Sequence, residues 1–203
     1  MMRTILFIIL SSLIISLPSY AKDSDQMTQF VKSKWELKNE IIQQVINGDI
    51  IVDTEVETID KEQKFAMKAI GLHPKSCARV LRKLSRYEEF SNWIPYIKKS
   101  KYNEANKLIT IHADHFLLPF PMLVHIIIDR TNKEGDYPFV FPTGIFLNLK
   151  GTVSIREFNN RCLFFSESKW RGKHTGINDL VIEIFATTLS KIGAEMLVRK
   201  TQF

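Results

Sequence analysis

The stretch Gly176 to Lys200, GINDLVIEIFATTLSKIGAEMLVRK, decides how the rest of the chain is arranged. Apolar residues recur in it at spacings of three and four, which predicts one amphipathic helix with a single buried face. The predicted buried stripe consists of Ile177, Val181, Ile184, Phe185, Thr188, Ile192 and Met196. Because much of the preceding chain has the pattern of strands, the partner of this face is expected to be a sheet.

The opposite side of this helix is predicted to face water. It carries Asp179, Glu183, Thr187, Lys191 and Ala194. Gly193 in the helix interior costs about 1 kcal/mol relative to alanine. A close approach by another backbone would account for it, and a merely tolerated glycine is the alternative.

The first residues predict an export signal. Arg3 precedes the apolar run Ile5 to Leu17, and Pro18 is followed by the small-residue pattern Ser19-Tyr20-Ala21. This combination is typical of a cleavable secretory signal peptide. An uncleaved anchor is the alternative, although a membrane span needs ~20 apolar residues and this run is shorter. We therefore expect a signal peptide over residues 1–21 and a mature chain that is secreted or periplasmic.

Net charge and cysteine content limit the kinds of partner and metal site that the sequence allows. The net charge of +6 suits an anionic membrane surface, nucleic acid or simple solubility, and export argues against nucleic acid. The two cysteines, Cys77 and Cys162, lack the spacing of a zinc site. Export permits a disulfide between them, but sequence gives no distance, so two buried thiols remain the alternative.

Periodicity predicts the order of the other elements. A helix over 22–47 is followed by a hairpin of strands 50–57 and 64–72, and a second helix opens at His73-Pro74. About five further strands precede the last helix, over 108–118, 123–130, 137–141, 145–158 and 162–171. The order predicts an α+β fold in which the helices are kept to one face of an antiparallel meander.

Several motifs in this order resemble the START-like (SRPBCC) helix-grip superfamily, which includes polyketide cyclases, coenzyme Q-binding proteins and lipid-transfer START domains. They are the "tyrosine, then tryptophan-x-proline" segment Tyr87 to Pro95, Leu118-Pro119-Phe120-Pro121, Lys150-Gly151-Thr152-Val153 and the terminal helix. The resemblance covers roughly Ile50 to Arg199, so residues 49–203 are expected to form the helix-grip domain and 22–48 an extra N-terminal helix. The family's arginine-aspartate pair after the Pro-x-Pro turn is not met, because Val124 and His125 occupy that region.

The resemblance implies a curved antiparallel sheet that grips the long C-terminal helix and leaves a cavity for an apolar ligand. The candidate ligand-binding residues are Trp93, Phe120, Leu123, Phe146, Trp170, Phe185, Thr188, Leu189 and Ile192. Plain core packing is the alternative for each. Trp93, Phe120, Met122 and Leu123 lie in turns beside Lys98, Lys99 and Lys101, where they would rim the cavity or touch a bilayer.

Catalytic signals are weak. The densest titratable group is His112-Ala113-Asp114-His115, but on a strand His112 and Asp114 face away from His115 and cannot converge with it. No nucleophile elbow, phosphate-binding loop or HExxH motif occurs. We therefore predict no catalytic residue, no metal ligand and no cofactor, and we expect His73 and His174 at the surface.

Three hypotheses follow. The first is an exported, non-enzymatic protein that binds a lipid-like or isoprenoid molecule beneath its last helix, with peripheral membrane contact as an option. The second is a cyclase or dehydratase, which would place Asp114, His125 or Glu167 in the same cavity. The third is an envelope interaction module with a filled core, which would dock through its basic helix.

Overall fold

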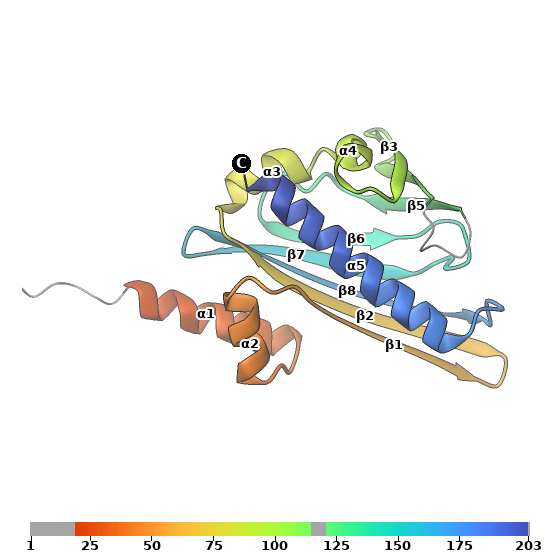
Figure 1. Ribbon diagram of the computed structural model, residues 1–203, viewed down its shortest axis with the longest axis horizontal. Helices are drawn as coiled ribbons and strands as arrows, with labels where there is room; N and C mark the ends of the chain where they lie inside the picture. Colours follow the sequence, from red (N-terminus) through yellow and green to blue (C-terminus); the bar gives the residue numbers. More distant parts are fainter. Residues whose placement is uncertain (1–18, 115–120, 203) are drawn as a thin grey trace, which may run out of the picture.

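A curved antiparallel sheet carries a long helix across one face and two shorter helices against the other (Figure 1). The computed structural model describes residues 19–114 and 121–202. Most of the expected signal peptide lies outside these residues, as do His115 and Phe120. The predicted α+β helix-grip architecture is confirmed.

The described strands form one eight-stranded sheet. They are β1 (Ile51–Ile59), β2 (Glu62–His73), β3 (Ile97–Asn103), β4 (Leu108–Ala113), β5 (Met122–Ile128), β6 (Gly135–Val140), β7 (Lys150–Phe158) and β8 (Arg161–Lys173). Their order is β1-β2-β8-β7-β6-β5-β4-β3, and every neighbouring pair is antiparallel. Pairing of β8 with β2 joins the N-terminal hairpin to the meander, so the last strand lies inside the sheet.

The turns of the two predicted hairpins use residues that tolerate left-handed backbone. Asn159 and Asn160 join β7 to β8 with φ values of 51° and 56°. Asparagine tolerates this conformation better than most residues, which makes it suitable for a two-residue hairpin loop. Asp60, with φ 56°, adopts the same left-handed conformation in the turn between β1 and β2.

Strand β3 is absent from the sequence-based prediction, which treated its lysines only as basic surface. In the sequence IKKSKYN only Ile97 and Ser100 are buried, so no apolar alternation marks the strand. It lies at the edge of the sheet, where exposed lysines discourage pairing with another chain. Strand β7 begins at Lys150, so the predicted strand start at Ile145 is wrong.

Five α-helices are described, with a 3-10 turn η1 (Tyr87–Glu89) before the fourth. They are α1 (Ser19–Lys34), α2 (Asn39–Ile46), α3 (Cys77–Leu84), α4 (Phe90–Trp93) and α5 (Asp179–Thr201). The single helix predicted over 22–47 is therefore two helices. No helix in the described ranges is both long and apolar enough to cross a membrane.

The helices do not all lie on one face, which corrects the predicted layout. Val31 of α1 and Ile42 of α2 pack in one cluster with Leu163 and Phe165 of β8. Ser166 and Ser168, which alternate with those residues, face α5 instead. Because β2 and β8 carry apolar side chains on both faces, the sheet needs a cover on its outer side as well, and α1 and α2 provide it.

Cys77 and Cys162 form a disulfide, with 4.6 Å between their Cα atoms. The bond links the first residue of α3 to β8, and both side chains are buried. The backbone N–H of Cys77 also donates to the Glu157 carboxylate at 2.7 Å, which satisfies a free amide at the helix start. Helix α3 is thus fixed to the inner face of the sheet, and the alternative of two free thiols is wrong.

His73 is fully buried, so its expected surface position is wrong, whereas His174 is exposed. The Nδ1 atom of His73 accepts a hydrogen bond from the backbone N–H of Lys75 at 3.0 Å. Its Nε2 atom lies 2.9 Å from Thr201 Oγ1 and 3.3 Å from the Val198 carbonyl oxygen. The histidine therefore fastens the C-terminal end of α5 to the end of β2.

Candidate functional site

A cavity of about 650 Å³ lies between α5 and the inner face of the sheet. Side chains from β2, β4, β5, β7, β8 and α5 line it, together with residues of the β6–β7 connection. Its lining is mostly aliphatic and aromatic, as is typical of sites for hydrophobic small molecules. The fold therefore lacks the filled core that the interaction-module hypothesis requires.

The cavity exists because small residues face each other across it. On the sheet side these are Ala69, Ser166 and Ser168, and on the helix side they are Ala186, Ser190, Gly193 and Ala194. Protein interiors are normally packed to crystal-like density. Here the short side chains on both surfaces leave space between the helix and the sheet unfilled.

The inward face of α5 differs from the predicted stripe. The helix residues that line the cavity are Val181, Ile182, Phe185, Ala186, Leu189, Ser190, Gly193, Ala194 and Leu197. Ile184 is 55% exposed and Thr188 is exposed, so their assignment to the buried face is wrong, as is that of Ala194 to the solvent face. The prediction followed the largest apolar residues, but the cavity face is built largely from small ones.

Three of the predicted ligand-binding residues line the cavity: Phe146, Phe185 and Leu189. Trp170 is buried beside them, with its ring edge-on to Phe146 at 5.2 Å and its Nε1–H donating to the Leu147 carbonyl oxygen at 3.0 Å. The ring of Trp93 packs against Phe90 at 5.9 Å.

The other predicted positions lie elsewhere. Leu123 is 59% exposed on β5, and its neighbour Met122 lines the cavity instead. Ile192 is half-buried on α5 and is not among the described lining residues. Phe120 lies outside the described part of the chain.

Tyr96 is a cavity residue that the sequence-based analysis missed. Its hydroxyl donates to the Leu189 carbonyl oxygen at 2.8 Å, which joins the segment after α4 to the middle of α5. Burial raises the pKa of Tyr96 to about 12, so the phenol stays protonated as a donor. A tyrosine after a proline in a turn carries no periodic signal, so only the three-dimensional contact identifies its role.

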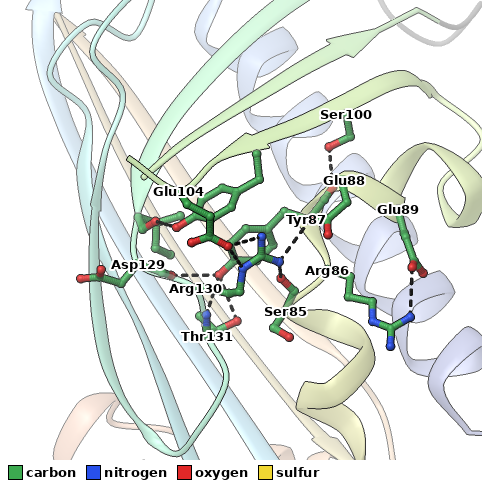
Figure 2. A network of polar contacts seen from close by, with 12 residues as sticks. Ser85, Arg86, Tyr87, Glu88, Glu89, Ser100, Glu104, Asp129, Arg130 and Thr131 are labelled. Atoms are coloured by element: carbon green, nitrogen blue, oxygen red, sulfur yellow. Dashed lines mark hydrogen bonds and ion pairs between the residues drawn. The ribbon is translucent and has the colours of Figure 1, made fainter. Parts of the chain in front are cut away.

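Two lining residues of the cavity belong to a polar network (Figure 2). The hydroxyls of Tyr87 and Thr131, both lining residues, lie 3.0 Å apart, and burial raises the pKa of Tyr87. Behind them the Arg130 guanidinium stacks 4.5 Å from the Tyr102 ring centre and bonds to Glu104 at 2.6 Å. The charged residues of this network, Arg130, Glu88 and Glu104, pair with one another and are not among the lining residues.

None of the three candidate catalytic residues lines the cavity. Asp114 is exposed, Glu167 is on the outward-facing register of β8, and the His125 ring lies 2.7 Å from the Thr143 hydroxyl. The titratable lining residues are the two tyrosines, Tyr87 and Tyr96. Within 19–114 and 121–202, no group of three or more His, Cys, Asp or Glu side chains could hold a metal ion.

The cavity has an opening to solvent. Ile145 in the β6–β7 connection and Val181 in the first turns of α5 both line it, yet they are 41% and 37% exposed. The lining of the cavity thus reaches the molecular surface at these two apolar side chains.

Comparisons with known proteins support the fold alone. No protein-family model and no curated protein matches the sequence. Among solved structures, a START superfamily protein from Mycobacterium smegmatis aligns at 10% identity with a TM-score of 0.55, covering 68% of this chain and 97% of that one. The Zhui aromatase/cyclase from a Streptomyces species aligns at 9% identity with a TM-score of 0.58, covering 68% and 94%. Ara h 8.0201 aligns at 12% identity with a TM-score of 0.51, covering 68% and 97%.

The chain therefore has a START-like helix-grip fold, the class of architecture that the sheet, the gripping helix and the cavity define. About a third of this chain falls outside each of these alignments.

Proposed function

We propose that this protein binds a hydrophobic, lipid-like or isoprenoid small molecule in the cavity under α5. The observation that carries the proposal is the lining of the 650 Å³ space, in which aromatic and aliphatic side chains predominate. The apolar side chains around a space of this size lack many van der Waals contacts that a filled core would give them. An apolar ligand would restore those contacts, and the resemblance of the sequence motifs to the helix-grip superfamily implies such a ligand as well.

Export is part of this proposal. The N-terminal sequence predicts a cleavable signal peptide, and the Cys77–Cys162 disulfide is a bond that persists in oxidising compartments. Both features support a periplasmic or secreted protein.

We further propose that the open end of the cavity touches a membrane. We call the large apolar side chains that are exposed in the described residues the apolar rim; they are Ile59, Leu123, Ile145, Leu147, Leu180, Val181 and Ile184. Thr58, at the tip of the β1–β2 hairpin, bonds to Asp179 at the start of α5, and Thr143 bonds to His125 of β5. These contacts gather the hairpin tip, the helix start and β5 at one end of the sheet (Figure 1).

Basic residues lie beside this rim. Lys99 of β3 pairs with His112 of β4, which pairs with Leu123 of β5, so Lys99 and Leu123 share a face two strands apart. Lys98 and Lys101 are also exposed. Apolar side chains with neighbouring lysines suit an anionic bilayer, where each basic residue near the surface contributes about 1 kcal/mol.

Ligand binding is tested on the mature protein, expressed with its signal sequence and purified without detergent. Native mass spectrometry and organic extraction are expected to release a co-purified neutral lipid or isoprenoid at up to one molecule per chain. The proposal fails if the protein carries no such molecule and also does not enhance the fluorescence of the neutral apolar probe N-phenyl-1-naphthylamine.

Membrane contact is tested by sedimentation with vesicles of phosphatidylglycerol or phosphatidylcholine. Leu147→Ser and Lys99→Gln are each expected to weaken binding to the anionic vesicles about fivefold. Lys32→Gln is the matched control, since Lys32 is exposed on α1, away from the rim. Equal loss in Lys99→Gln and Lys32→Gln would indicate attraction by net charge alone, and no binding by the unmodified protein would exclude the contact.

A further inference from the structure

The size of the cavity limits what it can hold. Its volume is about 650 Å³. In a liquid, one non-hydrogen atom with its hydrogens takes up about 30 Å³, the share of a water molecule, so the space accommodates about 20 such atoms. A single hydrocarbon chain or a small system of fused rings has this size. A phospholipid with two long acyl chains is more than twice as large.

The lining offers no partner for a charged group. The described lining residues include no Asp, Glu, Lys, Arg or His side chain. The titratable side chains among them are Tyr87 and Tyr96, and because burial raises the pKa of both, both are neutral at physiological pH. A carboxylate, phosphate or amine inside the cavity would be a buried charge without a counter-ion, which is strongly unfavourable.

A charged head group that stayed outside would lie where the lining reaches the surface, at Ile145 and Val181. Ile145 belongs to the β6–β7 connection, in which residues 141–149 carry no charge. Val181 belongs to the start of α5, where residues 175–190 include Asp179 and Glu183 but no lysine or arginine. Neither of these two segments therefore supplies a cation for an anionic head group.

The start of α5 is also unfavourable for an anion. The Asp179 carboxylate accepts hydrogen bonds from the Thr58 hydroxyl at 2.6 Å, the Thr58 backbone N–H at 2.8 Å and the Gln63 amide at 2.5 Å. The bonds from Thr58 and Gln63 lower the pKa of Asp179, so it is ionised at neutral pH. The positive end of the helix dipole thus already has a negative partner, and a ligand anion beside it would be repelled.

We infer that the ligand is a single uncharged molecule of about 20 non-hydrogen atoms or fewer, with one chain or a small ring system. This inference rests on the proposed binding function and narrows it. Long-chain alcohols, esters and ketones and neutral terpenoids have the required size and charge, whereas ionised fatty acids and two-chain phospholipids do not.

Probes of equal chain length test the exclusion of charge. 1-Tetradecanol, tetradecanoate and tetradecylamine share one chain, and the last two are charged at about pH 7.5. Each is titrated against the complex of the full mature protein with N-phenyl-1-naphthylamine, and the decrease in fluorescence gives its affinity. The alcohol is expected to bind at least about tenfold more tightly than either ion. The inference is overturned if either ion binds as tightly as the alcohol.

A lysine in the cavity wall should reverse this preference. Ala186 of α5 lines the cavity, so Ala186→Lys supplies the missing counter-ion and should raise the ratio of tetradecanoate to tetradecanol affinity about tenfold. Thr188→Lys is the matched control, because it adds the same charge at an exposed position of the same helix. An equal rise in both variants, or no rise in an Ala186→Lys protein with an unchanged circular dichroism spectrum, would overturn the inference. If Ala186→Lys does not fold, the three probes on the unmodified protein decide.

A series of 1-alkanols, supplied as cyclodextrin complexes, tests the limit of size. Affinity should rise about threefold per methylene group while the chain still enters the cavity, and it should stop rising at about 20 non-hydrogen atoms. Ala186→Leu narrows the space and should lower that limit by about three carbon atoms, whereas Thr188→Leu should leave it unchanged. Affinity that continues to rise at the same rate beyond the limit would overturn the inference.

The two proposals fail differently. If the unmodified protein binds N-phenyl-1-naphthylamine and the shorter alkanols, the proposed function survives every result with the ions and the longest chains. If it binds neither, both proposals fail.

Discussion

The hydroxyl of Tyr96 occupies the space that a Cβ atom at Gly193 would need. The same hydroxyl donates to the Leu189 carbonyl oxygen, one turn earlier on α5. The glycine is therefore a packing requirement, which the sequence left open, and the group that passes close to it is a side chain and not a backbone. This contact sets how closely the segment after α4 approaches the helix at the cavity wall.

Gly193→Ala is expected to destabilise the protein by about 1 kcal/mol. Alanine gains about 1 kcal/mol of helix propensity, but its methyl group displaces the Tyr96 hydroxyl, and a buried hydroxyl without a partner costs about 1–3 kcal/mol. In a Tyr96→Phe background the clash disappears, so the same substitution should stabilise by up to about 1 kcal/mol. Urea unfolding of the four proteins in this double-mutant cycle measures the coupling; additive effects would contradict it.

Leu189→Trp is expected to fill the cavity. The larger ring would occupy space that the ligand needs, so the enhancement of N-phenyl-1-naphthylamine fluorescence should be lost while the circular dichroism spectrum is retained. Overpacking should lower stability by at most about 1–3 kcal/mol, because the ring enters empty space. Thr188→Trp is the control, since Thr188 is the adjacent helix residue and is exposed. Loss of binding in both variants would mean that the probe sits outside the cavity.

Removal of the disulfide is expected to lower the free energy of unfolding by about 2–5 kcal/mol. The bond closes a loop between cysteines separated by 85 positions, which restricts the unfolded chain strongly. The check is urea unfolding of the Cys77→Ala/Cys162→Ala double variant beside the unmodified protein. Dithiothreitol should reproduce the loss in the unmodified protein and have no effect on the variant. An unchanged midpoint in the variant would contradict the prediction.

Acidification is expected to loosen the C-terminal end of α5 through His73. Burial lowers the pKa of His73 below its usual value and outweighs the backbone hydrogen bonds with Val198 and Lys75, which act in the opposite direction. The folded state thus binds a proton less readily than the unfolded chain. The stability is complete above about pH 6.5 and declines as pH falls toward the lowered folded pKa, by at most about 1.4 kcal/mol per pH unit.

Urea unfolding at a series of pH values between about 7.5 and 5 measures this dependence. His73→Gln should remove it, at the cost of lower stability at neutral pH, because an amide replaces the ring that bonds to Thr201 and Val198. His174→Gln is the control, as His174 is exposed and should leave the slope as it was. A slope that persists in His73→Gln would assign the effect to other groups.

Much of the architecture is predictable from local patterns. The β1–β2 hairpin follows from alternation, the β7–β8 turn from two asparagines, and α5 from a helical period. Strand β3 was not predicted, because an edge strand with one buried face and several lysines has no apolar alternation. The sequence did not predict that α1 and α2 cover the outer face of the sheet. This covering depends on apolar residues of β2 and β8 that point away from the cavity.

The candidate site was predictable only in part. Phe146, Phe185 and Leu189 are large and apolar, and they could be selected because such residues usually face inward. Thr188 was placed on the wrong side of α5, since the helix turns its small residues toward the sheet. Tyr96 carries no sequence signal, because its importance lies in its contacts with Leu189 and Gly193 of α5.

The sequence by itself determined that a long amphipathic helix follows an antiparallel sheet, because hydrophobic periodicity is a local property that each segment expresses alone. Only the tertiary structure decided that the helix and the sheet do not close on each other. That outcome depends on small residues in both walls of the cavity, such as Ala69 and Ser166 on the sheet and Ala186 and Ala194 on the helix. Small residues are compatible with tight packing or with a cavity, and the difference is set by the larger side chains around them.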